Sequence, residues 1–224
     1  DKMIDLIGDN YSLLQVMSRF GLSLGFGDKT VKEVCEMNNV DCQTFLVVVN
    51  FMAEGFSRMD GSADDISIPA LVDYLRQAHI YFLDYCLPAI RRKLIEAIDC
   101  SQDDVSFLIL KFFDGYMREV RKHMEYEEKT VFKYVDTLIH GNAPKNYQIS
   151  TFSKHHDQVG ERLTELKNII IKYCPAKANT NVLNAALFDI YACEEGLESH
   201  CKVEDYLFVP AILKLERRMR ENEK

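Results

Sequence analysis

The sequence has few residues that interrupt helices. Its 224 residues include five prolines, ten glycines and no tryptophan. This scarcity of helix breakers favours long helices over a turn-rich β fold. The longest apolar run, Phe45 to Val49, is far too short to span a bilayer. The sequence also lacks G-x-G-x-x-G, Walker and G-x-S-x-G motifs, so these signatures of nucleotide binding and serine hydrolysis are absent.

The cysteines lack the spacing of a disulfide framework. They are odd in number and scattered, and no C-x-x-C occurs. This distribution predicts free, mostly buried thiols in a reducing compartment. Because the first residues contain no apolar signal region, we expect a cytoplasmic protein. The seven cysteines are Cys35, Cys42, Cys86, Cys100, Cys174, Cys193 and Cys201.

An excess of positive charge is absent as well. The formal net charge is −8, and basic residues cluster only from Lys214 to Arg220. Nucleic-acid phosphates select surfaces rich in Lys and Arg, so we expect no nucleic-acid partner. The basic cluster fits a solvated helix end, where positive charge suits the helix dipole. We expect no membrane partner either.

Residues 1–58 predict a small helical domain. Asn10 and Asp41 are each followed by helix-forming sequence and can cap a helix. Between them, Thr30 and Glu33 form a capping-box pattern that starts a further helix. The N-terminal part of the chain is therefore expected to contain three short helices.

Four long amphipathic segments follow a polar, breaker-rich stretch at 59–67, which we interpret as a linker. Each segment carries an apolar stripe at helical spacing. Four such helices with modest connections predict an all-α, up-down-up-down four-helix bundle over residues 68–224. Pro88 lies inside the first helix and is expected to kink it. The four segments span residues 68–98, 103–139, 149–174 and 180–219.

Two of these segments repeat a His-x-x-x-Glu turn, in which both side chains share one helix face. The other two segments each place one histidine in the apolar stripe. A single histidine there is more often a hydrogen-bonded core residue than a ligand, but all four segments repeat the pattern. A buried carboxylate is costly unless it is paired or binds a cation. The candidate ligands are His79, His123, Glu127, His156, His200 and Glu204.

This pattern predicts a dinuclear metal site. Six ligands for two ions leave coordination positions open, which indicates small-molecule chemistry rather than structural clamping. Imidazole and carboxylate ligands suit iron, zinc, manganese or copper, so ligand type alone does not name the metal. Successive helix residues point about 100° apart. The spacing from Phe152 therefore places His156 on the stripe and His155 off it.

Residues 68–217 resemble a hemerythrin-type cation-binding bundle, and the whole chain resembles the bacterial repair-of-iron-centres proteins. The matching motifs are H-x-x-x-E-E at His123, H-D-x-x-G at His156, and H-x-x-x-E with a following L-F and proline at His200. The resemblance implies a hemerythrin-like fold that holds two non-haem iron ions on the six candidate ligands. It also implies that Glu127 and Glu204 bridge the ions, with an oxo or hydroxo group as a further bridge.

The N-terminal part also resembles the small leading domain of that family, from Phe20 to Val31 and from Glu33 to Cys35. It departs from the family at Gly25-Phe26, which stand where an adjacent cysteine pair is usual. Glu119 matches a family acid on a path to the irons, although an exposed helix charge is an equally good interpretation of it.

The resemblance implies a role in recovering iron–sulfur centres after nitrosative or oxidative stress, by reacting with small ligands or donating iron. The expected partners are O2, NO or peroxide, and damaged iron–sulfur proteins; a homodimer is also open. Two alternatives remain, an oxygen or nitric-oxide sensor or carrier of hemerythrin type, and a metal-free helical interaction protein. The sequence does not decide whether the protein is an enzyme that turns over a substrate.

Overall fold

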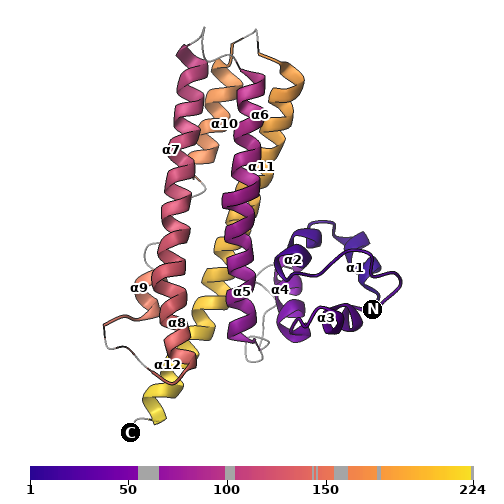
Figure 1. The fold of residues 1–224 in the computed structure, drawn as a ribbon, viewed down its shortest axis with the longest axis vertical. Coiled ribbons are helices and arrows are strands. Elements are labelled where there is room, and N and C mark those ends of the chain that lie inside the picture. The colour runs from indigo at the N-terminus through magenta and orange to yellow at the C-terminus, as the bar shows by residue number, and fades with distance from the viewer. Residues whose placement is uncertain are drawn as a thin grey trace. The chain divides into compact units, whose positions relative to one another are not determined.

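The computed structural model describes residues 1–54, 66–98, 104–142, 144, 146–153, 161–175 and 178–222. Within these ranges the regular structure is helical, apart from an isolated bridge between Lys2 and Thr30. The chain is an all-α bundle preceded by N-terminal helices, which confirms the predicted fold class (Figure 1). In this part of the chain, no helix is both long and apolar enough to cross a lipid bilayer.

Contacts between residues divide the chain into two compact units. The first joins Asp1–Ala78, Tyr134–Ser153 and Lys202–Lys224, and the second joins His79–Lys133 and Lys154–Cys201. The domain limits expected from the sequence, 1–58, 59–67 and 68–224, stay a prediction. Most of the expected linker, residues 59–65, lies outside the described residues.

Four helices open the chain, and local capping signals explain two of them. The backbone N–H of Glu33 donates to the Thr30 hydroxyl, and the backbone N–H of Thr30 donates to the Glu33 carboxylate at 2.8 Å. This confirms the predicted capping box. Asp41 also caps its helix as expected, by accepting from the backbone N–H of Thr44 at 2.8 Å. The four helices are α1 (Met3–Asp9), α2 (Leu13–Arg19), α3 (Val31–Met37) and α4 (Cys42–Glu54).

The sequence pattern does not predict α1. Its N-cap residue, Lys2, makes no side-chain capping hydrogen bond. Instead, the backbone N–H of Met3 donates to the carbonyl of Lys29 at 3.0 Å, and the Met3 side chain is fully buried. Contacts distant in sequence therefore hold this helix. The prediction that Asn10 caps the next helix is wrong, because the N-cap of α2 is Ser12; the Asn10 side chain instead accepts from the backbone N–H of Ser12 at 3.1 Å, just before α2 begins.

Gly25 lies in the turn between α2 and α3 with φ +85°. Residues with a side chain rarely adopt this left-handed conformation, whereas glycine does so at little cost. A cysteine at position 25 would therefore be strained in this turn.

Within the first unit, the N-terminal helices pack against α5 (Ile68–Ile80). The ring of Phe20 lies 5.4 Å from the ring of Phe45 and 4.8 Å from the ring of Tyr74. The buried Arg19 guanidinium donates to the Tyr74 hydroxyl at 3.3 Å. This aromatic cluster fixes α2 and α4 against the start of α5.

Within the described residues, each of the four expected long segments contains helices. The first consists of α5, a π-helical turn at Tyr81–Cys86, and α6 (Leu87–Ala97). The second consists of α7 (Asp104–Tyr126), a π-helical turn at Glu127–Val131, and α8 (Phe132–Ile139). The third includes α9 (Ile149–Ser153) and α10 (Glu161–Tyr173). The fourth consists of α11 (Thr180–Val203), a π-helical turn at Glu204–Phe208, and α12 (Val209–Asn222).

Pro88 is accommodated by the π-helical turn that precedes it. Proline lacks a backbone N–H, and its ring clashes with the carbonyl four residues earlier in a regular helix. Pro88 lies in the first turn of α6, and the N–H of Leu87 donates to the carbonyl of Phe82, five residues back. The sequence predicts a kink at Pro88, and the structure has this wider turn directly before that position.

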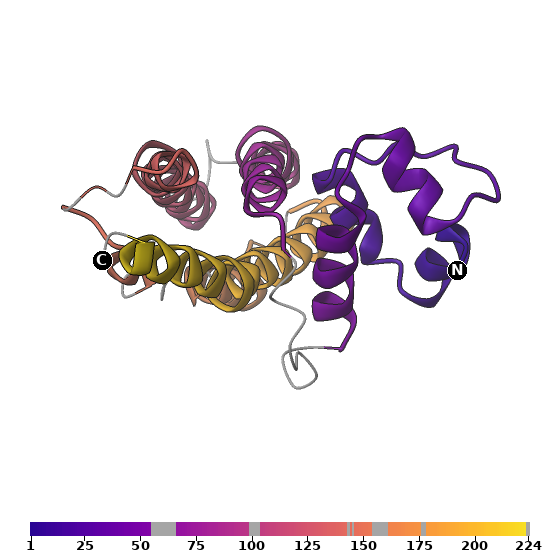
Figure 2. The ribbon, with the colours of Figure 1, turned by 90° about the horizontal axis from the view of Figure 1, so that it is seen from below.

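Within the second unit, α6 and α7 run side by side in both views (Figures 1 and 2). Arg91 on α6 donates to both carboxylate oxygens of Asp114 on α7, at 2.6 and 3.1 Å. Lys93 on α6 pairs with Asp189 on α11 at 2.5 Å. Because these pairs are partly exposed while Phe113 is fully buried, they fix which helix faces meet around the apolar core.

Candidate metal centre

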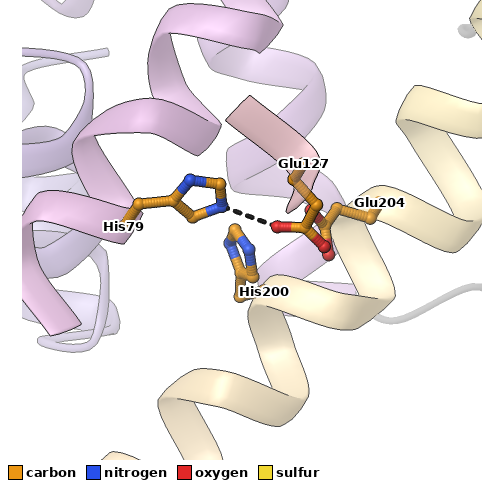
Figure 3. Close-up of side chains that lie close together, drawn as sticks. All are labelled: His79, Glu127, His200 and Glu204. Carbon is orange, nitrogen blue, oxygen red and sulfur yellow. Dashed lines mark ion pairs between the residues drawn. The ribbon is translucent and has the colours of Figure 1, made fainter. Parts of the chain in front are cut away.

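Three helical segments bring two histidines and two glutamates together (Figure 3). His79 lies in the last turn of α5, and Glu127 opens the π-helical turn after α7. His200 lies on α11, and Glu204 follows it by one turn on the same continuous helix. Each residue offers one ligand atom, and these atoms all lie within 4.8 Å of one another. His79, Glu127 and His200 belong to the second unit.

All four side chains are shielded from water. Glu127 and Glu204 are 0% exposed, His200 is 1% exposed and His79 is 3% exposed. Burying an ionised carboxylate costs several kcal/mol unless hydrogen bonds or a cation compensate for the lost hydration. Two carboxylates and two imidazoles at such short separations therefore form a pocket of electron-pair donors in a dry interior. That is the environment in which a metal cation binds.

The Glu127 carboxylate lies between two imidazoles. Its Oε2 is 2.9 Å from Nε2 of His79, and its Oε1 is 2.8 Å from Nε2 of His123. His123 stands one turn earlier on α7, and its side chain is 20% exposed. Each carboxylate oxygen thus faces a different ring nitrogen, one from α5 and one from α7. A carboxylate in this position can share its two oxygens between two cations.

Glu128 orients the His79 ring, a role that the sequence did not predict. Its Oε1 lies 2.9 Å from Nδ1 of His79. When Nδ1–H donates to a carboxylate, the imidazole is held in the tautomer that presents its Nε2 lone pair. That nitrogen is the one directed at Glu127. The only sequence signal for this role was the second glutamate of the H-x-x-x-E-E motif. Glu128 lies off the apolar stripe of its own helix and points to a neighbouring helix, so the stripe did not select it.

Aromatic contacts hold the two buried imidazoles in place. The His79 ring stacks on Phe132, with centroids 5.5 Å apart and planes 11° apart. The His200 ring meets the His79 ring edge-on at 5.1 Å, and the Phe82 ring at 6.1 Å. Rings packed on several sides have few alternative rotamers. The nitrogen donors are therefore positioned before any ligand arrives, which lowers the entropy cost of binding.

Both glutamates of the group open a π-helical turn. The N–H of Phe132 donates to the carbonyl of Glu127, and the N–H of Val209 donates to the carbonyl of Glu204, each five residues back. A third such turn begins two residues after His79. Single π-helical turns are rare and occur frequently at functional sites. Their position at three points around this cluster agrees with a binding role.

The donor set fits a cation of the first transition row. Imidazole nitrogen suits iron, zinc and copper, and carboxylate oxygen suits harder ions such as manganese. The group contains no thiolate, which is the usual ligand of structural zinc sites. Among the described residues, His79, Glu127, His200 and Glu204 form this group of donors. The residues present therefore fit a bound metal ion without naming it.

The remaining predicted ligand, His156, lies outside the described residues, as do its neighbour His155 and the rest of the H-D-x-x-G motif. The structure brings together His79, Glu127, His200 and Glu204, and it places His123 against Glu127. His140 lies just after α8, where it is exposed and contacts the backbone carbonyl of Asp136 at 2.8 Å. His140 therefore stands apart from the group.

Glu119 pairs with Arg162 of α10 on the surface of the second unit. Its side chain is 56% exposed, and the Arg162 guanidinium also lies over the ring of Phe112 at 5.6 Å. An apolar cavity of about 580 Å³ is lined by these three residues among others. The ion pair favours a structural tie between α7 and α10, so the sequence interpretation of Glu119 as an exposed charge describes it better.

Comparison with known proteins gives one family. The sequence profile described as "Hemerythrin HHE cation binding domain" matches residues 70–212 of the chain. No curated protein matches the chain. The matched range contains every predicted ligand and well over half of the sequence. Together with the all-α bundle and the buried His/Glu group, this match shows that the chain belongs to the hemerythrin HHE cation-binding family.

Proposed function

We propose that the protein is a non-haem di-iron protein of the repair-of-iron-centres type, acting in the cytoplasm. The observation that carries this proposal is the Glu127 carboxylate, which faces His79 with one oxygen and His123 with the other. A second carboxylate, Glu204, lies in the same buried group. Two bridging carboxylates with separate imidazoles on each side fit two adjacent cations better than one.

In this proposal the histidines anchor the ions and the glutamates link them. His79, His123 and His200, with His156 by the sequence register, each supply one nitrogen. Glu127 and Glu204 would supply carboxylate oxygens to the two ions and would offset their positive charge. Glu128 keeps the Nε2 lone pair of His79 directed at the site. When bound, the iron ions would supply open coordination positions and electrons for reaction with O2, NO or peroxide.

The repair role rests on the resemblance and on the arrangement of the site. Six ligands leave two ions incompletely coordinated, so the site suits exchange of small ligands or release of iron. The proposed clients are iron–sulfur proteins damaged by NO or oxidants. The second candidate is a sensor or carrier of O2 or NO, and Gly25-Phe26 in place of the family cysteine pair favours it.

A client assay separates the two candidates. The iron-loaded full chain is mixed, with a chemical reductant and without other iron sources, with a hydratase whose iron–sulfur cluster has lost one iron to an oxidant but keeps its sulfide. Hydratase activity and the iron content of each protein are then measured after separation. For the repair role we expect hydratase recovery with matching loss of iron from this chain. Unchanged iron in both proteins, with reversible absorption changes on adding and removing NO, would instead support the sensor or carrier.

Two matched variants control that assay. Glu127→Gln removes the proposed bridging charge and should abolish recovery of the hydratase. Glu125→Gln makes the same chemical change two residues earlier, at an exposed carboxylate that pairs with Lys129 at 2.8 Å. It should leave recovery unchanged. A metal-free helical interaction protein, the third alternative, would show no specific metal in either variant or in the unmodified chain.

A further inference from the structure

The apolar cavity beside the Glu119–Arg162 pair lies within the second unit, where α7 and α10 pack against each other (Figure 1). Its volume of about 580 Å³ falls in the range of small-molecule sites. Among the described residues, the lining comes from these two helices, and none of the four residues of the metal centre contributes to it. The proposed metal chemistry therefore does not account for this cavity.

The cavity follows the length of both helices. On α7 the lining residues fall at spacings of three and four from Val105 through Phe112 to Glu119, which is one face of the helix. At about 1.5 Å per residue this face is about 21 Å long, and the lining of α10 from Arg162 to Tyr173 is about 16 Å long. Packed helix axes lie only about 8–10 Å apart. The cavity is therefore long and narrow, a shape that suits one extended chain better than a compact ring system.

Gly115 provides part of this space, in the middle of the α7 lining. Glycine destabilises a helix interior relative to alanine, and Gly115 lies within α7 without a positive φ. Apart from the helix backbone and its chain neighbours, a Cβ atom at this position would find Nη2 of Arg118 as its nearest neighbour, at 3.8 Å. Neither backbone strain nor crowding therefore requires glycine here. Its missing side chain leaves room beside the cavity for a ligand.

The two ends of the cavity differ in polarity. At one end, the Arg162 guanidinium pairs with Glu119 and lies over the Phe112 ring at 5.6 Å. At the other end the lining is apolar, and it includes Leu108, which is 57% exposed, and Tyr173, which is 65% exposed. A hydrocarbon chain that covered these two side chains would remove apolar surface from water, which favours binding.

Lys111 adds a second positive charge to the lining. Among the described residues, its ammonium has no ion-pair partner, whereas Glu119 offsets the charge of Arg162. The lining therefore keeps one net positive charge, although the formal net charge of the whole chain is −8. A ligand with a single negative head group complements this charge, and a cationic head group would be repelled.

We propose that this cavity binds one free long-chain fatty acid. The alkyl chain lies along the apolar lining of α7 and α10 and covers Leu108 and Tyr173, and the carboxylate lies near the Lys111 ammonium. A lysine stem packs on apolar surface while its charge stays in water, so Lys111 serves both parts of the ligand. Binding is non-covalent and requires no metal ion.

Calorimetric titration of the full chain with tetradecanoate, below the concentration at which it forms micelles, tests the proposal. We expect saturable binding of one molecule per chain. Tetradecyltrimethylammonium has a similar alkyl chain and the opposite head-group charge, so it should bind at least about fivefold more weakly. The absence of saturable tetradecanoate binding, or equal binding of the two compounds, would overturn the proposal.

Variants of α7 test the role of the lining. Gly115→Leu fills the cavity with an apolar side chain, and leucine favours a helix more than glycine does. It should weaken tetradecanoate binding at least about tenfold with the helical circular dichroism retained. Lys122→Leu introduces the same side chain at an exposed position of α7 and should leave binding unchanged. Lys111→Gln should weaken binding about two- to fivefold, because this lysine is exposed. Unchanged binding to the Gly115 variant would contradict the assigned site.

Photochemical labelling locates the ligand without any variant. The full chain is irradiated with a fatty acid that contains a diazirine on its alkyl chain, and the tryptic peptides are mapped by mass spectrometry. Because trypsin cleaves after Lys111 and Arg118, one peptide spans residues 112–118, and another spans Asn168–Lys172. We expect the label on these peptides, and excess tetradecanoate should remove it. Label confined to other peptides would overturn the proposal.

Sedimentation velocity separates the fatty acid from a second copy of the chain as the occupant of the cavity. The unmodified chain and Gly115→Leu should sediment alike, because the proposed ligand does not link two chains. A dimer of the unmodified chain that dissociates in Gly115→Leu would show that a second copy covers this face, and would contradict the proposal. Each measurement is made on metal-free and on iron-loaded protein, so its outcome is independent of the proposed di-iron function.

Discussion

Glu127 is directed at a different imidazole with each of its two carboxylate oxygens, and it is fully buried. This arrangement would let Glu127 contact two cations, whereas each histidine could bind only one. In the proposed di-iron site, removing its charge would leave two neighbouring cations with one bridge fewer and with stronger mutual repulsion. The histidines could still bind, but each ion would lose a shared ligand.

We therefore expect Glu127→Ala to lose iron, or to hold iron that exchanges readily with a chelator, while the helical circular dichroism is retained. Second-coordination changes around metal sites typically cost 10–100-fold in affinity, and a lost bridge should cost at least about that much. Elemental analysis and chelator competition measure the effect. The exposed Glu125→Ala is the matched control. Full iron occupancy and an unchanged absorption spectrum in the Glu127 variant would reject the bridging role.

Residues 155 and 156 give a second prediction at the same scale. Both are histidines, so chemistry does not distinguish them, and both lie outside the described residues. The helical register from Phe152 selects His156 as the ligand. His156→Ala should lose iron or shift its charge-transfer bands strongly, whereas His155→Ala should keep the iron. Equal effects of the two substitutions on iron content would show that the register is wrong.

At the scale of single elements, the sequence predicted what depends on local signals. The capping box at Thr30 and the cap at Asp41 are present because short side chains beside a helix start satisfy its free N–H groups. The π-helical turns at Glu127 and Glu204 were not predicted. A π-helical turn contains one residue more than an α-helical turn. An apolar stripe that is identified by regular α-helical spacing does not reveal this extra residue. Helix α1 was also missed, because a distant backbone hydrogen bond and burial of Met3 hold it.

The tie between α6 and α7 carries a pH-dependent prediction. Hydrogen bonds from the Arg91 guanidinium hold the pKa of Asp114 below its ordinary value. A lowered folded-state pKa adds stability above the unfolded-state pKa of about 3.9, and that stability is lost as the pH falls through the folded-state value. Because both side chains are about one-third exposed, we expect Asp114→Asn to cost only about 0.5–1 kcal/mol at neutral pH.

Urea unfolding at several pH values measures this cost. The difference between Asp114→Asn and the unmodified chain should shrink as the pH falls below about 4 and vanish once Asp114 is protonated. The exposed Asp84→Asn is the control and should show little difference at any pH. A constant difference from neutral to strongly acidic pH would show that the Arg91 pairing is not its source.

At the scale of the whole molecule, the all-α fold followed from four apolar stripes, and most of the candidate site followed from histidines in those stripes. Glu128 was missed as part of the site because its contact comes from His79 on another helix. The periodicity of one helix does not predict its side-chain contacts with another helix.

Metal binding should stabilise the whole fold, because the ligands come from segments far apart in the sequence and are assembled only in the folded chain. A ligand that binds only the native state adds about 2.7 kcal/mol at one hundred times its dissociation constant. The chelated protein should therefore melt at a lower temperature than the iron-loaded protein, and ferrous iron should restore the melting temperature. Scanning calorimetry of both forms checks this. Equal melting temperatures would contradict binding at the buried group.

The central claim is that the buried His/Glu group holds two iron ions, and the iron content of the purified full chain tests it most directly. The protein is made with adequate iron, or reconstituted anaerobically with ferrous iron and desalted, and metals are measured by mass spectrometry against a protein concentration from amino-acid analysis. We predict about two irons per chain, because two glutamates and the flanking histidines serve a dinuclear site. One zinc per chain, or no bound metal under these conditions, would contradict the account.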